Sequence, residues 1–416
     1  MVFRCADPYF YIRMVKWYDL ENPTGRNDHD KEEKVVKLRL SFLLGIIVPL
    51  LLSNAHGEES EGMRFPYLIP SLDVPAQLDF CEERVPIEIQ DMRERLEKEL
   101  LLSLWDRPQV ILWLKRVPRY MPYIESMLKD NNVPDDLKYI AIAESALRPH
   151  VSSKRGAIGF WQFMKDTGQK YGLLINEHID ERRNLFASTR AAIRYLKDLH
   201  EKLGSWTLAA AAYNMGEQGL EAEILEQGTD NYYHLYLPLE TQRFIFRILS
   251  VKLIVSNPER YGFYLSEQDF YPPMEFDQIQ LACSQDTPIR IIAEAAKTHF
   301  KAIKDLNPEI RGHYLAQGSH TLLIPKGSPQ DFHHQYQKLL LQWMASREEA
   351  IYIVKEGDNL SLIADRFNIP LASLLIWNRL DLRAAIYPGD RLIIYRKASE
   401  SMEADKEIGG EEEDNL

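Results

Sequence analysis

One glutamate, Glu144, stands where the sequence predicts the apolar face of a helix. Pro134 suits the first turn of that helix, apolar residues recur at helical spacing from Leu137, and Pro149 ends the helix soon after Glu144. Partial burial of the carboxyl group and the negative end of the helix dipole would both raise its pKa. A carboxylic acid that keeps its proton near neutral pH can act as a general acid.

A structural role for Glu144 stays open when the helix is considered alone. Arg148 follows Glu144 at the spacing of two residues that face each other on a helix. Ion pairs of this kind perturb carboxylates without any catalytic role, so the helix by itself favours a salt bridge at the edge of the core. The motifs around the helix decide between the two interpretations.

Short polar and aromatic motifs follow Glu144 in a fixed order. By residue type alone they are ambiguous, because a tyrosine or methionine can belong to the core and an asparagine can end a helix. The motif residues are Ser145, then Ser153 in a polar loop, then Gly159, Gln162 and Met164 in one run, and finally Tyr213 and Asn214 just before a glycine.

This ordered set resembles the motifs of the lytic transglycosylases with a goose-lysozyme-like SLT domain, of the membrane-bound murein transglycosylase D type. The resemblance covers residues 85–265. It implies a mainly α lysozyme-like domain in which Glu144 is the catalytic residue and the other motif residues bind the substrate. The periodicity agrees with this fold class, since helices are predicted at 86–104, 110–117, 121–128, 190–203 and 206–213.

The resemblance also implies a reaction without water. Glycosidic cleavage usually needs two carboxylates, and no second one stands out beside the motif. In the family, the glutamate protonates the leaving oxygen of the MurNAc-GlcNAc β-1,4 bond and then deprotonates the 6-hydroxyl group of the muramic acid, which leaves a 1,6-anhydro-MurNAc end. Two alternatives remain, a hydrolytic goose-type muramidase and a non-catalytic protein that binds the cell wall.

A later segment, 237–244, resembles the closing motif of the same family. A tyrosine is usual at the position of Phe244, so a polar role for that position is in doubt. Glu240 is a candidate contact at the substrate site, although a glutamate is also common in the first turn of a helix.

An internal repeat occupies the C-terminal third and aligns without a gap at an offset of 71 residues. The second copy, 350–397, resembles a LysM domain, a small α+β (βααβ) module that binds glycans containing N-acetylglucosamine. The resemblance assigns glycan binding to residues Gly357, Asp358, Leu360, Trp377 and Asn378.

The first copy, 281–326, has lost part of this pattern. Asp286 stands in place of Gly357, and Leu306 stands in place of Trp377. We therefore expect a degenerate LysM-like repeat with weak glycan binding or none. Residues 327–349 are predicted to form a helical spacer between the copies, and the acidic tail 398–416 cannot build a core.

Length and composition limit the other possibilities. The chain has 416 residues, enough for two or three domains, and 45% apolar residues exclude a mainly disordered protein. Its net charge of −12 argues against a nucleic-acid partner. No His, Cys and Asp cluster has metal-ligand spacing, so we expect neither a metal nor a cofactor. Peptidoglycan glycan strands are the expected partner.

The N-terminal segment is typical of export. Basic residues precede an apolar run, Leu40 to Leu52, and small residues up to Ala55 suit a signal peptidase. Residues 1–55 are therefore predicted to be a leader with a cleaved signal peptide, whose true start lies further downstream, and 56–84 a linker. The run is too short for a permanent transmembrane span, so we expect a periplasmic protein.

Two cysteines remain after the leader, Cys81 and Cys283. Export makes a disulfide possible, but the two residues are far apart in the sequence and have no typical spacing. The repeat places Cys283 at the position of Val354, which favours a buried core thiol.

Overall fold

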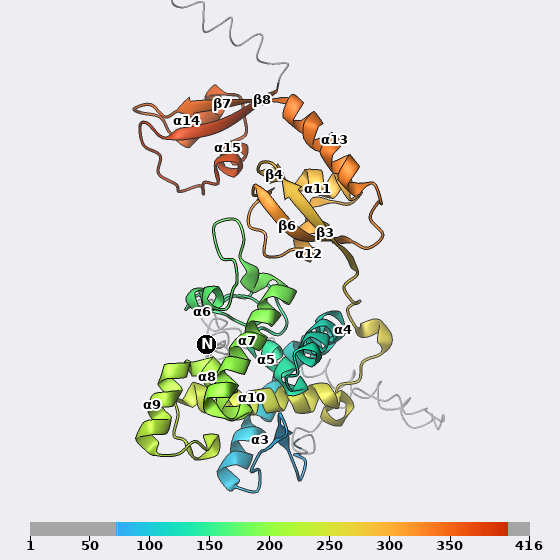
Figure 1. Ribbon diagram of the computed structural model, residues 1–416, viewed down its shortest axis with the longest axis vertical. Coiled ribbons are helices and arrows are strands. Elements are labelled where there is room, and N and C mark those ends of the chain that lie inside the picture. Colours follow the sequence, from blue (N-terminus) through green and yellow to red (C-terminus); the bar gives the residue numbers. More distant parts are fainter. Residues whose placement is uncertain (1–71, 73, 398–416) are drawn as a thin grey trace, which may run out of the picture. The chain divides into compact units, whose positions relative to one another are not determined.

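The computed structural model describes residue 72 and residues 74–397, shown in colour in Figure 1. The predicted leader, signal peptide and acidic tail lie outside the described residues. Within the described part, no single helix is both long and apolar enough to cross a bilayer. Residues up to 269 contain mainly helices, and two small βααβ units follow, as the sequence predicts.

Two long helices open the helical region. Helix α3 spans Gln90–Trp105, and α4 spans Arg107–Asp130. The sequence predicted two separate segments within α4, but one helix runs through Pro118 and Pro122. A proline inside a helix costs a backbone hydrogen bond. Apolar residues from Val110 to Leu128 form one buried stripe along α4, and this burial holds the helix together across both prolines.

The helix that carries Glu144 is short. Residues Asp135–Leu137 form a single 3-10 turn, η2, and α5 follows at Lys138–Ser145. Ala146 then adopts a left-handed conformation with φ of 55°, which ends the helix one residue after Ser145. The apolar side chains of α5 are buried between α10 and α4, which fixes the direction in which Glu144 leaves the helix.

Further helices complete this region. The long ones are α7 (Leu185–Leu203), α8 (Trp206–Met215), α9 (Glu217–Gln227) and α10 (Leu239–Ser256). Short turns connect them: α6 (Lys165–Lys170), η3 (Glu181–Arg183), η4 (Tyr232–His234), η5 (Pro258–Tyr261) and η6 (Glu267–Asp269). Four consecutive alanines of α8 are buried, so this helix packs closely on its neighbours.

A glutamate from a small hairpin anchors the start of α8. Strands β1 (Asp79–Phe80) and β2 (Glu83–Arg84) form the hairpin. The Glu83 carboxylate accepts hydrogen bonds from the backbone N–H groups of Trp206 and Thr207, at 2.5 and 3.0 Å. An anion at a helix N-terminus is stabilised by the free N–H groups and the dipole. The opposite end of α8 carries Tyr213 and Asn214.

The first repeat is a complete βααβ unit. Its elements are β3 (Phe276–Cys283), β4 (Thr287–Pro288), α11 (Ile289–Ala295), α12 (Phe300–Leu306), β5 (Tyr314–Leu315) and β6 (Gly318–Pro325). Strands β3 and β6 pair antiparallel, with Phe276 opposite Pro325 and Cys283 opposite Gly318. Buried aliphatic side chains from both helices and both strands form its core.

The second repeat has the same order of elements: β7 (Arg347–Ile353), α14 (Leu360–Arg366), α15 (Leu371–Asn378) and β8 (Arg391–Lys397). In both copies an asparagine amide joins the second helix to the last strand. Asn307 donates to Leu323 O at 2.7 Å and accepts from its N–H group, and Asn378 does the same with Ile393. The partners lie one residue closer in the second copy, so the two copies differ by one residue in the last strand, after the matched pair Gly318 and Gly389.

The helix between the repeats is part of the first one. A helical spacer was predicted, and α13 indeed spans Phe332–Ala345. Its apolar side chains, including Tyr336, belong to the core of the first repeat, so α13 packs as a third helix of that repeat. Cys283 lies in this core with its sulfur 3.6 Å from the Tyr336 hydroxyl group, and both Cys283 and Cys81 are buried free thiols.

Candidate active site

Glu144 lies in the last turn of α5 and is partly buried. The pKa of its carboxyl group is raised to about 7, chiefly by burial, with the positive charge of Arg247 lowering this pKa and the negative charge of Glu240 raising it. The elevated pKa predicted from the sequence is confirmed. Two of the charges that act on Glu144 therefore come from α10, which packs against α5. A carboxyl group with a pKa near neutral pH can act as a general acid or as a general base.

Tyr213, at the end of α8, lies close enough to Glu144 for the carboxylate charge to raise the pKa of the phenol, in addition to the larger effect of burial. Its hydroxyl group donates a hydrogen bond of 2.6 Å to the carbonyl oxygen of Trp161. The ring packs on Tyr195, with 5.3 Å between ring centroids. The structure thus brings Tyr213 and Glu144 together, as the motif order predicted.

Asn214 connects the end of α8 to the start of α10. The Thr241 hydroxyl group donates a hydrogen bond to Asn214 Oδ1 at 3.1 Å. Thr241 directly follows Glu240, so this bond fixes the first turn of α10 beside the Tyr213-Asn214 pair. The sequence predicted Asn214 and Glu240 but missed Thr241. Its place inside the closing motif was the available signal.

Ser145 acts inside the protein. Its side chain is buried, and its hydroxyl group donates to the Phe160 carbonyl oxygen at 2.8 Å. This bond ties the end of α5 to the segment that carries the next motif. The predicted contact between Ser145 and substrate remains a prediction, and the geometry assigns the residue a positioning role.

The loop after α5 folds back on itself and presents three of the predicted residues. Ser153 accepts a hydrogen bond from the Ala157 N–H group at 3.0 Å. Gln162 has a left-handed backbone, with φ of 50°, and its side-chain amide donates to Gly159 O at 2.8 Å. Met164 follows with an exposed side chain. The hydrogen-bonding groups of Ser153 and Gln162 are thus engaged in shaping the loop, and substrate binding by these residues stays a prediction.

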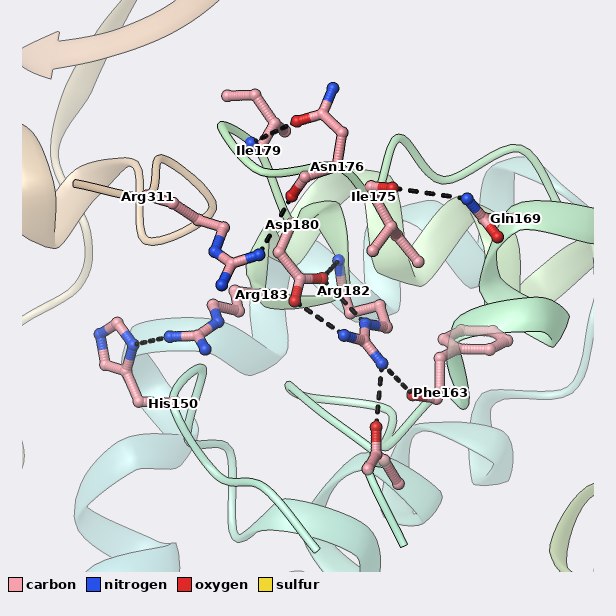
Figure 2. A network of polar contacts seen from close by, with 12 residues as sticks. His150, Phe163, Gln169, Ile175, Asn176, Ile179, Asp180, Arg182, Arg183 and Arg311 are labelled. Carbon is pink, nitrogen blue, oxygen red and sulfur yellow. Dashed lines mark hydrogen bonds and ion pairs between the residues drawn. The ribbon is translucent and has the colours of Figure 1, made fainter. Parts of the chain in front are cut away.

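Gly159 is required by a close approach to another segment. A Cβ atom at this position would lie 1.7 Å from the carbonyl oxygen of Arg182, and φ is 86°. Only glycine fits both conditions. Arg182 itself is buried, forms an ion pair with Asp180 at 2.8 Å and donates to the carbonyl oxygens of Gly156 and Phe163 (Figure 2). The sequence analysis missed this pair, although an acidic and a basic residue two positions apart in a turn were visible.

A buried charge cluster beneath the site was also missed. Glu99 on α3 is buried and accepts a hydrogen bond from Arg243 Nε at 2.5 Å, and Arg247 Nε lies 3.7 Å from its second oxygen. Arg247 Nη1 is buried without a hydrogen-bond partner in the described part of the chain. Glu240, Arg243 and Arg247 recur at helical spacing on α10, and this pattern could have indicated the cluster.

The predicted glycan-binding residues of the second repeat serve its own fold in several cases. Asp358 accepts from Tyr352 at 2.6 Å and from the Lys355 N–H group at 2.8 Å, and Asn378 holds the last strand. Leu360 is a core residue, and the turn at Gly357 needs a φ of 85°. Trp377 packs edge-on against Tyr395. Their contacts with glycan remain predictions.

Comparison with known proteins identifies two regions. The Transglycosylase SLT domain family matches residues 121–235, which include Glu144, Gln162, Tyr213 and Asn214. The LysM domain family matches residues 352–394. The chain thus combines an SLT transglycosylase domain with a LysM domain. The predicted recognition of both modules is confirmed.

Relatives of known name extend the match beyond these regions. A membrane-bound lytic murein transglycosylase D from Escherichia coli is 29% identical over 293 residues, 67% of this chain and 64% of that protein. The chain therefore spans slightly less than two thirds of its length. A protein of an Alteromonas species named for tributyltin chloride resistance is 32% identical over 110 residues, 26% of this chain and 53% of that protein. The solved lytic transglycosylase Slt from Pseudomonas aeruginosa is 18% identical, covers 44% of this chain and 31% of that one, and has a TM-score of 0.28.

Proposed function

We propose that this protein is a peptidoglycan lytic transglycosylase that cleaves the MurNAc-GlcNAc β-1,4 bond and leaves 1,6-anhydro-MurNAc ends. The observation that carries the proposal is Glu144, whose pKa lies near 7 and which stands beside Tyr213 inside an SLT domain. The related murein transglycosylase D from Escherichia coli supports the same reaction.

One carboxyl group can complete the reaction. Protonated Glu144 gives its proton to the glycosidic oxygen as the bond from that oxygen to the muramic acid C1 breaks. The resulting carboxylate then accepts the proton of the 6-hydroxyl group of the same sugar, while O6 forms the new bond to C1. The proton that leaves Glu144 is replaced by the one it receives, so no water enters. A pKa near 7 suits both halves of this cycle.

The surrounding residues position the sugar. Tyr213 ties the Trp161 segment to the end of α8, and Thr241 fixes Asn214 against α10. Both contacts hold side chains next to Glu144 in one arrangement before substrate arrives. Such preorganisation lowers the barrier because little has to move when the reaction occurs. Met164 offers an exposed apolar surface on the loop for a sugar face.

A hydrolytic muramidase is the second candidate, and one observation favours it. Glu240 lies close enough to raise the pKa of Glu144, so a second carboxylate is present near the site. In an inverting glycosidase a second carboxylate activates water. We assign Glu240 instead to tuning the acid, because a neighbouring negative charge helps Glu144 to keep its proton.

The LysM domain and the leader extend the proposal to the cell envelope. We infer that the LysM domain holds the enzyme on peptidoglycan and that residues 1–55 direct the chain to the periplasm, where a signal peptidase cleaves them. The Escherichia coli relative is named as membrane-bound, which agrees with a place in the envelope. N-terminal sequencing of the mature protein tests the cleavage, and an intact leader or a lipid-modified cysteine would contradict it.

Product analysis tests the reaction itself. The purified protein is incubated with peptidoglycan in the presence of a chelator, and the soluble products are identified by mass spectrometry. We expect 1,6-anhydromuropeptides from the wild type. Ordinary reducing ends would favour the hydrolase, and the absence of any product at a protein concentration that binds the sacculus would favour a wall-binding protein.

A further inference from the structure

A strand-like contact joins the first repeat to the SLT region. Ile179 and Ile310 form an antiparallel β-bridge. The Asp180 N–H group donates to Glu309 O at 2.9 Å, and the Arg311 N–H group donates to His178 O at 2.7 Å. Arg311 also donates from its side chain to Asn176 O at 3.1 Å, as Figure 2 shows. Three hydrogen bonds thus link one short loop of each region.

Apolar burial accompanies these hydrogen bonds. The Ile179 side chain is 7% exposed and belongs to the core cluster of the first repeat, together with Ile310 and residues of α11, α12 and α13. A residue from the SLT region therefore completes the core of another unit. A side chain shared in this way makes the contact specific, because moving either loop would expose apolar surface.

The same loop supports the segment beside Glu144. Asp180 is paired with Arg182, and the Arg182 guanidinium donates to the carbonyl oxygens of Gly156 and Phe163 at 3.0 and 3.3 Å. The backbone carbonyl of Arg182 fills the space that a side chain at position 159 would occupy. The run that carries Gln162 and Met164 is thus packed directly on the loop that the first repeat holds (Figure 2).

The second repeat presents its corresponding loop differently. In both copies a short loop follows the second helix and the bridging asparagine. Residues 381–383 of that loop in the LysM domain have exposed side chains. In the first copy the loop carries Glu309 and Ile310, both buried. Ile310 of the first copy is therefore buried, whereas Asp381 at the corresponding position of the LysM domain is exposed.

We propose that the first repeat is a fixed support of the active site, in which its Glu309–Arg311 loop holds residues 176–182 and, through Arg182, the run Gly156–Met164 that flanks Glu144. Ile179 and Arg182 are then positioning residues for the reaction, a role that rests on the proposed function. Loss of glycan-binding residues in this copy is the expected consequence of its new role, since its surface is used for an intramolecular contact.

Substitution of Ile179 tests the support in the full-length protein. Ile179→Ser removes the shared apolar side chain but leaves Arg182 and all residues of the repeat in place. Hydrogen exchange should become roughly tenfold faster at the amides of Arg311, Ile158 and Gln162, and kcat on soluble glycan fragments should fall by about tenfold or more, since small displacements cost much catalysis. Binding to insoluble peptidoglycan should not change.

Two matched variants control the experiment. Ile179→Val keeps most of the buried surface and should retain exchange rates and kcat within about twofold. Leu382→Ser makes the same kind of change on the exposed loop of the LysM domain and should leave both readouts at wild-type values.

The readouts separate this proposal from the proposed function. If the amides of Ile158 and Gln162 exchanged in Ile179→Ser at the wild-type rate, the proposal that the first repeat supports the active site would be overturned. An unchanged exchange rate at the Arg311 amide would also overturn it, because Ile179 would then contribute nothing to the contact. If the wild type released no glycan product, the proposed function would fail, whereas the exchange data would still decide whether the first repeat holds the loop.

Discussion

Glu144 and Glu309 share one electrostatic property and differ in their surroundings. Burial raises the pKa of both Glu144 and Glu309 to about 7. Glu144 ends a short helix, stays partly exposed, and faces Tyr213 and the charges of α10. Glu309 lies in the contact between the first repeat and the SLT region, is 6% exposed, and has one carboxylate oxygen without a hydrogen-bond partner in the described residues.

The comparison teaches what a perturbed pKa can and cannot identify. Desolvation acts on any buried carboxyl group, whether or not substrate can reach it. Function needs in addition access for the substrate and groups that position it, and Glu144 is the more exposed of the two glutamates and lies beside Tyr213. The Glu309 carboxylate is instead stabilised by a hydrogen bond from Asn184 and by the charge of Lys304, while the negative charge of Glu181 opposes its ionisation. The free-energy cost of ionising Glu309 arises because the packing of the first repeat against the SLT region buries its carboxyl group.

The largest expected difference between the two glutamates is in catalysis. Glu144→Gln removes the transferable proton and keeps the shape, so turnover of peptidoglycan should fall by at least about 10³-fold, in the upper range for general acid-base catalysis. Binding to sacculi should persist. Glu309→Gln is the matched control and should retain activity within about threefold. A comparable loss in both variants, measured by release of soluble muropeptides, would show that burial alone underlies the effect.

The dependence of activity on pH should follow Glu144. Its acid form is lost as the pH rises through about 7, so kcat/KM should decline up to tenfold per pH unit above that value. The second half of the reaction uses the carboxylate that the first proton transfer leaves on Glu144, so the titration of Glu144 itself should produce only the basic limb. In Glu309→Gln the same profile should be measured on soluble glycan. If the basic limb shifted in Glu309→Gln, the titration could not be assigned to Glu144 alone, which would contradict this prediction.

Sequence reasoning reached the acid and its partners because each lies in a short motif with a fixed order. Glu144 stood out from the helix pattern, whereas Tyr213 and Asn214 were named from the resemblance of their motif to the SLT family. The structure places Tyr213 beside Glu144, and Asn214 is the next residue in the chain. Long-range contacts left no comparable signal. The bridge between Ile179 and Ile310 joins residues that are far apart in the sequence, and neither has a residue type that indicates a partner. The role of Arg182 depends on that bridge and was missed with it.

Helix boundaries show the same limit on a smaller scale. The sequence predicted two helical segments, 110–117 and 121–128, and a proline inside a helix is locally unfavourable. The structure has one helix because burial along its whole length outweighs the local cost. Local chemistry thus predicted where helices can end, whereas tertiary packing determined where they do. The first repeat is a third example of this limit. The sequence showed that it lacks the equivalents of Gly357 and Trp377, but it did not show the contact between its loop and residues 176–182.

Substitution of the charged neighbours of Glu144 should shift the basic limb of the kcat/KM profile by smaller amounts. Glu240→Gln removes a negative charge that raises the pKa of Glu144, so the limb should shift to lower pH. Arg247→Met removes a positive charge that lowers this pKa, so the limb should shift to higher pH. Arg243, Glu99 and Tyr213 also face this cluster and are unchanged in both variants. Shifts in the same direction, measured as kcat/KM against pH, would exclude a purely electrostatic role.

Ionisation of Glu309 should affect the free energy of unfolding, and this is the smallest effect that we expect. Its pKa in the folded protein, about 7, lies above the ordinary value of 4.5, so the folded state binds the extra proton between these values. The stabilising contribution is therefore complete below pH 4.5, declines as the pH rises, and is lost above 7. The total change is on the order of 1–3 kcal/mol. The pKa of Glu144 is also raised, so Glu144→Gln and Glu309→Gln should each flatten part of the curve of unfolding free energy against pH.

Denaturant unfolding of the full-length protein at several pH values separates the two contributions. Glu309→Gln should be stabilised relative to wild type at pH 8 and should lose this advantage at pH 5, because glutamine carries no charge to desolvate. Hydrogen exchange at the Arg311 amide should show the same trend, since that amide lies in the contact that Glu309 occupies. If the difference in unfolding free energy between Glu309→Gln and wild type were the same at pH 5 and pH 8, ionisation of Glu309 would carry no cost in the folded protein. The pKa of Glu309 would then not be raised, and the two glutamates would not share this property.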